Sequence, residues 1–288
     1  MTRIEKRFEQ LRSERRKAFI PYITAGDPSL DITLELVLAL DKAGADLIEL
    51  GVPFSDPIAD GLVIQRATDR ALRNGVTLQK VLRLGENIRK KSEIPLDLFS
   101  YFNPLLNHGP EKLAKDAVAA GFDGVLATDL TIEESEPFVR TMRGAGLNTI
   151  FLVAPTSSPE RMKKIAQTSN GFLYAVSRTG VTGERQELAA DLKDFLRTLR
   201  SFTTAPIAVG FGISHPDHVH AVWQEADGAI VGSSIVKKVE ENIGKPELVS
   251  EVASFARWLK GAWGDRPNAI KEAEGSTDSG LVGGPDAK

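Results

Sequence analysis

Two carboxylates flank one predicted strand-to-helix loop, where they could act together as an acid and a base. Glu49 lies near the carboxyl end of the apolar stretch 45–51, which is typical of a buried strand. Asp60 follows a turn rich in Pro and Gly and precedes the apolar run 62–64, where a helix is predicted to begin. Burying an unpaired charge is expensive, so Glu49 needs a partner, a raised pKa or a chemical role.

Each carboxylate also has a purely structural explanation. Glu49 could be a barrel-interior carboxylate that is neutralised by an arginine or a lysine. Asp60 could be the N-cap of the helix that follows it, since Asp is common at that position. The residue pattern alone leaves both explanations open beside the catalytic one.

A second group of residues is rich in glycine and predicts a phosphate site. The stretches 209–214 (VGFGIS) and 231–234 (VGSS) each follow a predicted strand. Glycine lets backbone N–H groups approach a phosphate, and a helix that begins at Ser233 would direct its positive end toward one. Tight turns that need glycine are the alternative. No Walker-type lysine follows, which favours a phosphorylated metabolite over a nucleotide.

The polar loop 177–185, SRTGVTGER, carries two glycines and few residues that could pack in a core. It could be a lid that closes over a substrate and excludes water, or an ordinary exposed loop. Both interpretations stay open at the level of sequence.

Three histidines, His215, His218 and His220, raise the hypothesis of a metal site. Their spacing does not place all three on one helix face, and no second cluster supports them, so we expect no metal. We expect instead that Ser214 caps a surface helix with a proline in its first turn.

The composition excludes several classes of protein. The chain has 288 residues, a formal net charge of -3 and no long basic run, which argues against a nucleic-acid-binding surface. It has no cysteine, so disulfides, thiolate metal sites and cysteine nucleophiles are excluded. The amino terminus lacks the apolar core of a signal peptide and no stretch reaches membrane-spanning length, so we expect a cytoplasmic protein.

Strand-like and helix-like segments alternate along the chain after an amino-terminal amphipathic helix at 4–13. Glycines that end helices precede several strands, in the sequences AGAD (43–46), AGFDG (120–124), NGF (170–172) and ADG (226–228). The predicted fold is a single (β/α)₈ TIM barrel over residues 1–262 with an extra N-terminal helix, and an open doubly wound sheet is the alternative. The polar tail 263–288 is predicted to be disordered from about residue 272. The predicted strands are 19–24, 46–51, 96–101, 124–128, 149–153, 171–176, 207–210 and 228–231.

Several motifs resemble the tryptophan synthase α subunit family, over about residues 8–259. The segment ELGVPFSDP with ADG, which contains both Glu49 and Asp60, is the most specific of them. The others are YITAGDP (22–28), YFNP (101–104), GVTG (180–183) and GFGI (210–213). This resemblance implies a TIM barrel that cleaves indole-3-glycerol phosphate to indole and glyceraldehyde 3-phosphate by a retro-aldol reaction.

The resemblance also implies roles for single residues. Glu49 would be the general acid and base, and Asp60 would stabilise the protonated indolenine through its ring N–H. The phosphate would bind to backbone N–H groups of Gly183, Gly212, Gly232 and Ser233. The indole pocket and its lid would be formed by Tyr22, Phe99, Tyr101, Tyr174, Thr182 and Phe211.

The family resemblance implies a β subunit as partner, in an α2β2 heterotetramer that receives the indole. It implies no cofactor in this chain, with pyridoxal phosphate in the β subunit. Two alternatives are a non-catalytic allosteric or binding subunit and a stand-alone indole-releasing lyase. Another phosphate-binding barrel enzyme would call for a catalytic lysine at a strand end, and no predicted strand carries one there.

Overall fold

The computed structural model describes residues 1–176, 185–210 and 212–261, and for residues 185–191 only the backbone. The predicted tail 263–288 and most of the predicted lid therefore lie outside the described residues. The strands are β1 (Ala18–Thr24), β2 (Ile48–Gly51), β3 (Leu96–Ser100), β4 (Gly124–Ala127), β5 (Asn148–Ile150), β6 (Leu152–Val153), β7 (Leu173–Val176), β8 (Ile207–Gly210) and β9 (Gly228–Val231).

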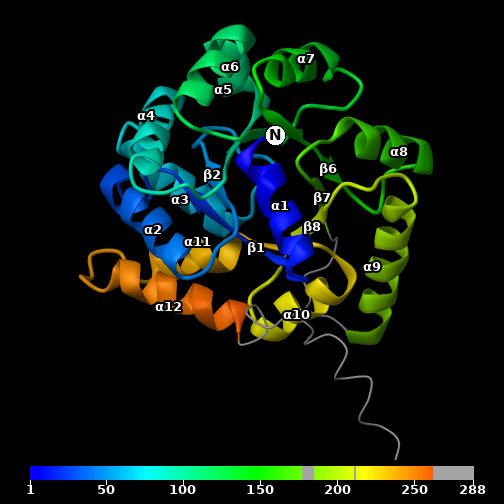
Figure 1. Ribbon diagram of the computed structural model, residues 1–288. Coiled ribbons are helices and arrows are strands. Elements are labelled where there is room, and N and C mark those ends of the chain that lie inside the picture. Colours follow the sequence, from blue (N-terminus) through cyan, green and yellow to red (C-terminus); the bar gives the residue numbers. More distant parts are fainter. Residues whose placement is uncertain (177–184, 211, 262–288) are drawn as a thin grey trace, which may run out of the picture.

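Helices follow most of the strands and surround them in a ring (Figure 1). No helix in the described ranges has both the length and the apolar character needed to cross a membrane. The helices are α1 (Arg3–Ser13), α2 (Leu30–Lys42), α3 (Leu62–Arg73), α4 (Leu78–Arg89), α5 (Phe102–His108), α6 (Pro110–Ala119), α7 (Glu136–Gly144), α8 (Pro159–Thr168), α9 (Arg185–Arg200), α10 (Pro216–Glu225), α11 (Ser233–Glu240) and α12 (Leu248–Lys260).

The strands form one parallel sheet in the order β5-β4-β3-β2-β1-β9-β8-β7-β6. The two ends of this order, β5 and β6, are consecutive in the chain and separated only by Phe151. The sheet therefore closes on itself, which confirms the predicted TIM barrel and rules out the open doubly wound sheet.

The predicted strand 149–153 is the one strand that the structure divides in two. β5 pairs with β4 and β6 pairs with β7, so the chain changes partner at Phe151. The backbone groups of Phe151 are nevertheless satisfied, because its N–H donates to Ser169 Oγ (3.2 Å) and its carbonyl accepts from the N–H of Tyr174 (3.2 Å). The two short strands act as the fifth strand of an eight-stranded barrel.

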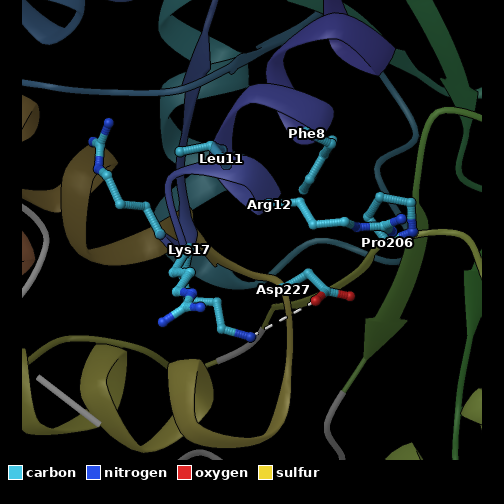
Figure 2. Close-up of a pocket in the computed structure, with 8 residues that line it drawn as sticks. Phe8, Leu11, Arg12, Lys17, Pro206 and Asp227 are labelled. Atoms are coloured by element: carbon cyan, nitrogen blue, oxygen red, sulfur yellow. Dashed lines mark ion pairs between the residues drawn. The ribbon is translucent and has the colours of Figure 1, made fainter. Parts of the chain in front are cut away.

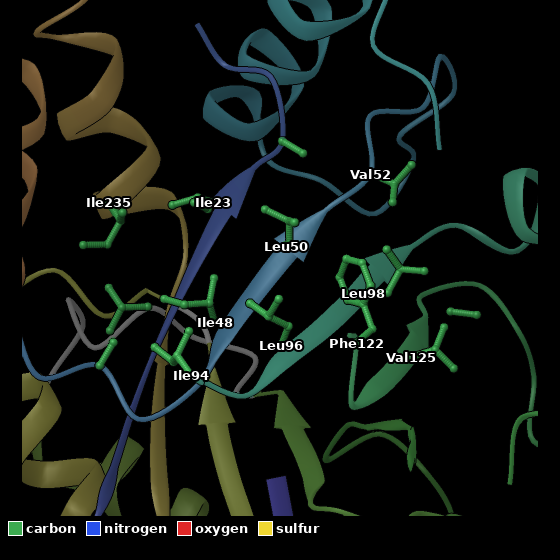
Figure 3. Close-up of a cluster of buried hydrophobic side chains, with 14 of the residues drawn as sticks. Ile23, Ile48, Leu50, Val52, Ile94, Leu96, Leu98, Phe122, Val125 and Ile235 are labelled. Carbon is green, nitrogen blue, oxygen red and sulfur yellow. The ribbon is translucent and has the colours of Figure 1, made fainter. Parts of the chain in front are cut away.

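Alternate residues along β2 and β3 face opposite sides of the barrel wall. Ile48, Leu50, Leu96 and Leu98 belong to the large cluster that packs between the strands and the outer helices (Figure 3). Because side chains alternate along a strand, the residues between them, Glu49 among them, point into the barrel. All four positions of β2 are buried, as expected for a strand covered on both sides.

Helix α1 lies across the middle of the ring of helices (Figure 1). It begins with a capping box between Thr2 and Glu5, and buries Ile4, Phe8 and Leu11 against a second apolar cluster inside the barrel. The predicted N-terminal helix is therefore confirmed, and it closes one end of the barrel.

A surface pocket lies beside α1 at the amino ends of the strands (Figure 2). It is lined partly by Phe8, Leu11, Pro206 and Asp227, and Lys17 forms an ion pair with Asp227 across it (3.7 Å). Active sites of TIM barrels lie at the opposite, carboxyl end of the strands. No predicted site residue lines this pocket.

Three aspartates join neighbouring strands in the same way. Asp46, Asp123 and Asp227 each lie just before a strand, and each donates its backbone N–H to a carbonyl of the strand alongside (2.8–2.9 Å). Their carboxylates accept the N–H of that same neighbouring residue, at Phe19 (2.8 Å), Leu96 (3.0 Å) and Ile207 (2.9 Å). These aspartates fall in the repeated glycine–aspartate sequences. Gly44, Gly121 and Gly171 have the positive φ of helix-ending glycines, whereas Gly228 is instead the first residue of β9.

Replacement Asp46→Ala tests these links. The carboxylate is fully buried, accepts the Phe19 N–H and pairs with Arg7 (2.6 Å). Its removal leaves a buried N–H without a partner, so we expect the free energy of unfolding to fall by about 2 kcal/mol. Urea denaturation measures this loss. The exposed Glu35→Ala on α2 is the control, and an equal change in both variants would contradict the structural role of Asp46.

Candidate active site

Glu49 lies on β2 between Tyr22 of β1 and Asp97 of β3, its register partners on the two sides. Its side chain is completely buried, and neither carboxylate oxygen has a hydrogen-bond partner in the part of the chain that the structure describes. The structural explanation that an arginine or lysine neutralises Glu49 is therefore wrong for the described part of the chain. A buried carboxyl group without a partner is the arrangement that favours the neutral acid.

Burial raises the pKa of Glu49 well above its ordinary value, and the nearby carboxyl of Asp97 raises it further. The neutral acid form of Glu49 is therefore favoured over its carboxylate. The raised pKa confirms the prediction from its apolar strand. A protonated carboxyl at the carboxyl end of a barrel strand can donate that proton to a bound substrate and then act as a base.

Asp60 lies in the loop between β2 and α3. The N-cap of α3 is Gly61, which makes no side-chain cap bond, so the alternative that Asp60 is the N-cap does not hold. Burial raises the pKa of Asp60 to about 6, although a hydrogen bond from Tyr101 lowers it. The hydroxyl of Tyr101 also accepts the N–H of Ala59 (2.9 Å). Tyr101 thus holds the loop that presents Asp60.

Three aromatic residues predicted for the indole pocket gather around the two carboxyls. Tyr22 and Phe99 contact edge to face, with ring centroids 5.1 Å apart. Burial raises the pKa of Tyr22, and Asp60 and Glu49 raise it further. The same charges raise the pKa of Tyr174 after the larger effect of burial. These shifts place both carboxyls and both tyrosine hydroxyls within electrostatic reach of one another.

Two glycines lack the side chains that would otherwise fill the space occupied by Tyr22 and Tyr174. A Cβ atom on Gly51 would overlap the hydroxyl of Tyr22, and one on Gly210 would overlap the hydroxyl of Tyr174. Gly51 ends β2 and Gly210 ends β8, so both lie at the carboxyl end of the barrel. The tyrosines can lean across these positions only because no side chain stands there.

The predicted phosphate site is built from the loops after β8 and β9. Gly232 is the N-cap of α11, and Ser233 is the first residue of that helix, as the sequence predicts. The first N–H groups of a helix have no partner within it, so they are open to an anion. Gly212 has a φ of 70°, and Ser234 Oγ donates to the carbonyl of Ile213 (2.8 Å), which joins the two loops.

Other predicted site residues cannot be placed. Thr182, Gly183 and Phe211 lie outside the described residues, and the predicted lid loop is described only at its last residue. The structure therefore adds nothing to the lid hypothesis or to these three positions.

The described ranges hold no cluster of three or more His, Asp and Glu residues that could bind a metal ion. The N-cap of α10 is His215, whose ring accepts the N–H of Asp217 (3.3 Å), so the prediction that Ser214 caps this helix is wrong. His215 also packs against Trp258 of α12, with ring centroids 5.2 Å apart.

An ion-pair network that sequence reasoning missed joins the elements on both sides of the site. Arg70 of α3 binds Asp27 through two nitrogens (2.7 and 2.9 Å) and Glu240 of α11 through a third (2.7 Å). Arg66 also binds Glu240, through two hydrogen bonds (2.8 and 2.7 Å). Asp27 follows β1, α3 follows Asp60, and α11 begins at the phosphate loop. The spacing of Arg66 and Arg70 on one helix face was the available signal.

A second missed residue is Asp97, whose carboxyl oxygens are buried without partners beside Glu49. The leucines on either side of it suggested only a buried strand. Nothing in the local sequence distinguishes a carboxyl that faces the barrel interior from one paired with a distant cation.

The family model for the "Tryptophan synthase alpha chain" matches residues 8–262. The chain belongs to the tryptophan synthase alpha chain family. The alpha chain of Solibacter usitatus (strain Ellin6076) is 51% identical over 266 residues, which are 92% of this chain and 100% of the relative. That of Geotalea daltonii (strain DSM 22248 / JCM 15807 / FRC-32) is 46% identical over 260 residues, covering 90% and 98%.

Solved tryptophan synthase structures share the fold. The alpha subunit from Legionella pneumophila str. Paris superposes with a TM-score of 0.82 at 39% identity, covering 90% of this chain and 98% of the other. A chain of the tryptophan synthase a2b2 complex from Pyrococcus furiosus gives 0.79 at 39% identity, covering 85% and 98%. The described barrel is thus that of a tryptophan synthase alpha chain.

The variant Gly51→Ala tests the packing of the site. The added methyl group has to displace the buried Tyr22 ring, so we expect a loss of about 2 kcal/mol in the free energy of unfolding. A double-mutant cycle with Tyr22→Leu measures the coupling. The loss should shrink when the ring is absent, and an unchanged loss would show that the methyl group strains something else.

Proposed function

We propose that this chain cleaves indole-3-glycerol phosphate to indole and glyceraldehyde 3-phosphate in the cytoplasm, as the α subunit of a tryptophan synthase. The observation that carries the proposal is Glu49, a carboxyl buried at the carboxyl end of a barrel strand, with a raised pKa and no hydrogen-bond partner among the described residues. Asp60, with a pKa of about 6, is ionised at neutral pH in the adjoining loop. One acid and one carboxylate are what this cleavage needs.

The reaction follows from these two protonation states. Glu49 gives its proton to indole C3, and the carboxylate of Asp60 accepts a hydrogen bond from the ring N–H and stabilises the positive indolenine. The Glu49 carboxylate then takes the proton of the side-chain hydroxyl. The carbon–carbon bond breaks, its electrons return to the ring, and indole and an aldehyde form. Glu49 ends the cycle protonated, so no proton is gained or lost.

The rest of the site binds the two ends of the substrate. We assign the phosphate to backbone N–H groups of Gly183, Gly212, Gly232 and Ser233, supported by the free N–H groups at the start of α11. We assign the indole pocket and its lid to six residues, namely Tyr22, Phe99, Tyr101, Tyr174, Thr182 and Phe211.

A β subunit is the proposed partner, in an α2β2 assembly that receives the indole and holds the pyridoxal phosphate. The Pyrococcus furiosus complex supports this by similarity. Exposed apolar residues on either side of Asp60 also support it, because Ile58 in the loop is 86% exposed and Leu62 at the start of α3 is 72% exposed. A partner that covers this loop would contact the element carrying a reacting group.

The first experiment measures indole release from indole-3-glycerol phosphate by the purified chain, alone and with a tryptophan synthase β subunit. Slow release that β strongly accelerates is the expected result. Fast release by the chain alone would indicate a stand-alone lyase. No release in either condition would leave the non-catalytic binding subunit.

Replacement Glu49→Gln removes the proton donor but keeps the size of the side chain. We expect indole release to fall at least about a thousandfold, since a general acid and base is lost, while substrate binding stays close to wild type. Steady-state kinetics and direct binding measurements separate the two effects. The exposed Glu35→Gln is the matched control, and wild-type turnover in Glu49→Gln would refute the assignment.

The pH dependence tests Asp60. Its carboxylate is needed, so kcat/KM should fall as the pH drops through about 6, whereas an ordinary aspartate would give this limb at about 4. Asp60→Asn should lose most activity with an unchanged melting temperature. An acid limb near 4, or a variant that is only less stable, would argue for a structural role of Asp60.

A further inference from the structure

The carboxyl of Asp97 has no role in the reaction described above, yet Asp97 lies next to Glu49, which does. Asp97 on β3 is the direct register partner of Glu49 on β2. Both alternate with leucines or isoleucines that face the outer helices, so both side chains point into the barrel. Directly opposite residues of neighbouring strands have Cβ atoms about 5 Å apart. The two carboxyls are therefore neighbours on the inner face of the sheet.

The surroundings of Asp97 are apolar. Its other register partner is Gly124 of β4, where a Cβ atom would lie 2.9 Å from Asp97 Oδ1 and 2.9 Å from a methyl group of Ile4. The missing side chain of Gly124 makes room for the carboxyl, and Ile4 of α1 and Ile150 of β5 line the same space. Asp97 is 0% exposed, and neither of its oxygens has a hydrogen-bond partner among the described residues.

The charged and titratable groups around this pair come from several elements. Tyr22 of β1 and Tyr174 of β7 face Glu49, and Asp60 approaches from the loop after β2. Asp123, just before β4, acts on Asp97, and its own charge is offset by Arg3 of α1 and Arg89 of α4. In the described ranges no lysine or arginine hydrogen-bonds either carboxyl of the pair.

We propose that Asp97 and Glu49 form one coupled carboxyl pair, in which Asp97 keeps the reacting proton on Glu49 over a wider range of pH. The inference rests on the proposed function of Glu49. Two neighbouring carboxyls in an apolar space cannot both ionise readily, so the charge that forms on one holds the proton on the other. Asp97 does not contact the reacting atoms in this scheme and is a positioning residue.

The direction of the effect follows from the charge on Asp97. Burial and then Asp123 raise the pKa of Asp97 to about 8, and Asp97 in turn raises that of Glu49. Once Asp97 is ionised, its negative charge opposes the loss of the Glu49 proton. The acid form of Glu49 is present below its pKa and is lost above it. Removing the charge of Asp97 should therefore move the loss of activity to lower pH.

The test is the pH profile of kcat/KM for indole release by wild type and Asp97→Asn. We expect the alkaline limb of the variant to lie lower by about one pH unit, while activity at slightly acid pH stays near wild type. The matched control is Ser100→Ala, which removes another buried group without a partner from β3 but no charge. Its profile should coincide with that of wild type.

An alkaline limb that stays in place in Asp97→Asn would overturn the proposal and leave Asp97 as filling of the barrel interior. This outcome differs from failure of the proposed function, in which wild type itself releases no indole. A shift of equal size in Ser100→Ala would also overturn it, because it would show that any change in β3 disturbs Glu49.

Infrared titration of the protonated carboxyl band keeps the proposal testable if Asp97→Asn does not fold. Above neutral pH the wild-type band should disappear in two separate steps, since the first charge opposes the second. Glu49→Gln should retain only one of them. A single step in wild type would contradict the coupling without any kinetic measurement.

Discussion

A carboxyl group sealed in a closed barrel without a partner is stable only as the neutral acid, and the chemistry of this protein depends on that constraint. Glu49 is in this situation because both sides of the sheet are covered, with aliphatic side chains outside the barrel and aromatic rings inside it. Water, a lysine or an arginine beside it would restore an ordinary carboxylate. The proton that the proposed reaction needs would thus be held by the fold.

Closure of the barrel is secured by contacts at both ends. At the amino end, aspartates before β2, β4 and β9 bind both backbone groups of a residue in the neighbouring strand. There α1 also covers the interior, and the pocket beside it is bridged by an ion pair (Figure 2). This end is built for stability, which leaves the loops at the carboxyl end free to serve the site.

At the carboxyl end, one charged network relates the two halves of the site. Arg70 connects the loop after β1 with α11, while α3, on which it lies, follows directly from Asp60. The group that would stabilise the indole nitrogen and the helix that would bind the phosphate are therefore tied through a few ion pairs. These ion pairs hold the loop after β1, α3 and α11 together at the carboxyl end of the barrel.

The repeated βα pattern, the N-terminal helix and the loops that carry Glu49, Asp60 and Ser233 could all be predicted from the sequence, because each depends on local periodicity and on where glycine and proline stand. The family motifs added the roles of the two carboxylates. Local sequence misjudged the cap at Ser214 and left the cap at Asp60 open, because a helix start is settled by backbone geometry within one residue. It also could not show that β5 and β6 are separate.

Only the tertiary structure decided what surrounds each carboxyl. The apolar strand of Glu49 is equally compatible with a distant arginine, and only the packed barrel shows that its neighbour is a second carboxyl, Asp97. The same holds for Gly51, whose missing side chain makes room for a tyrosine of another strand. Sequence determines which groups are available and on which face of a strand they lie. Their partners, and hence their protonation, come from residues far apart in the chain that meet only when the barrel closes.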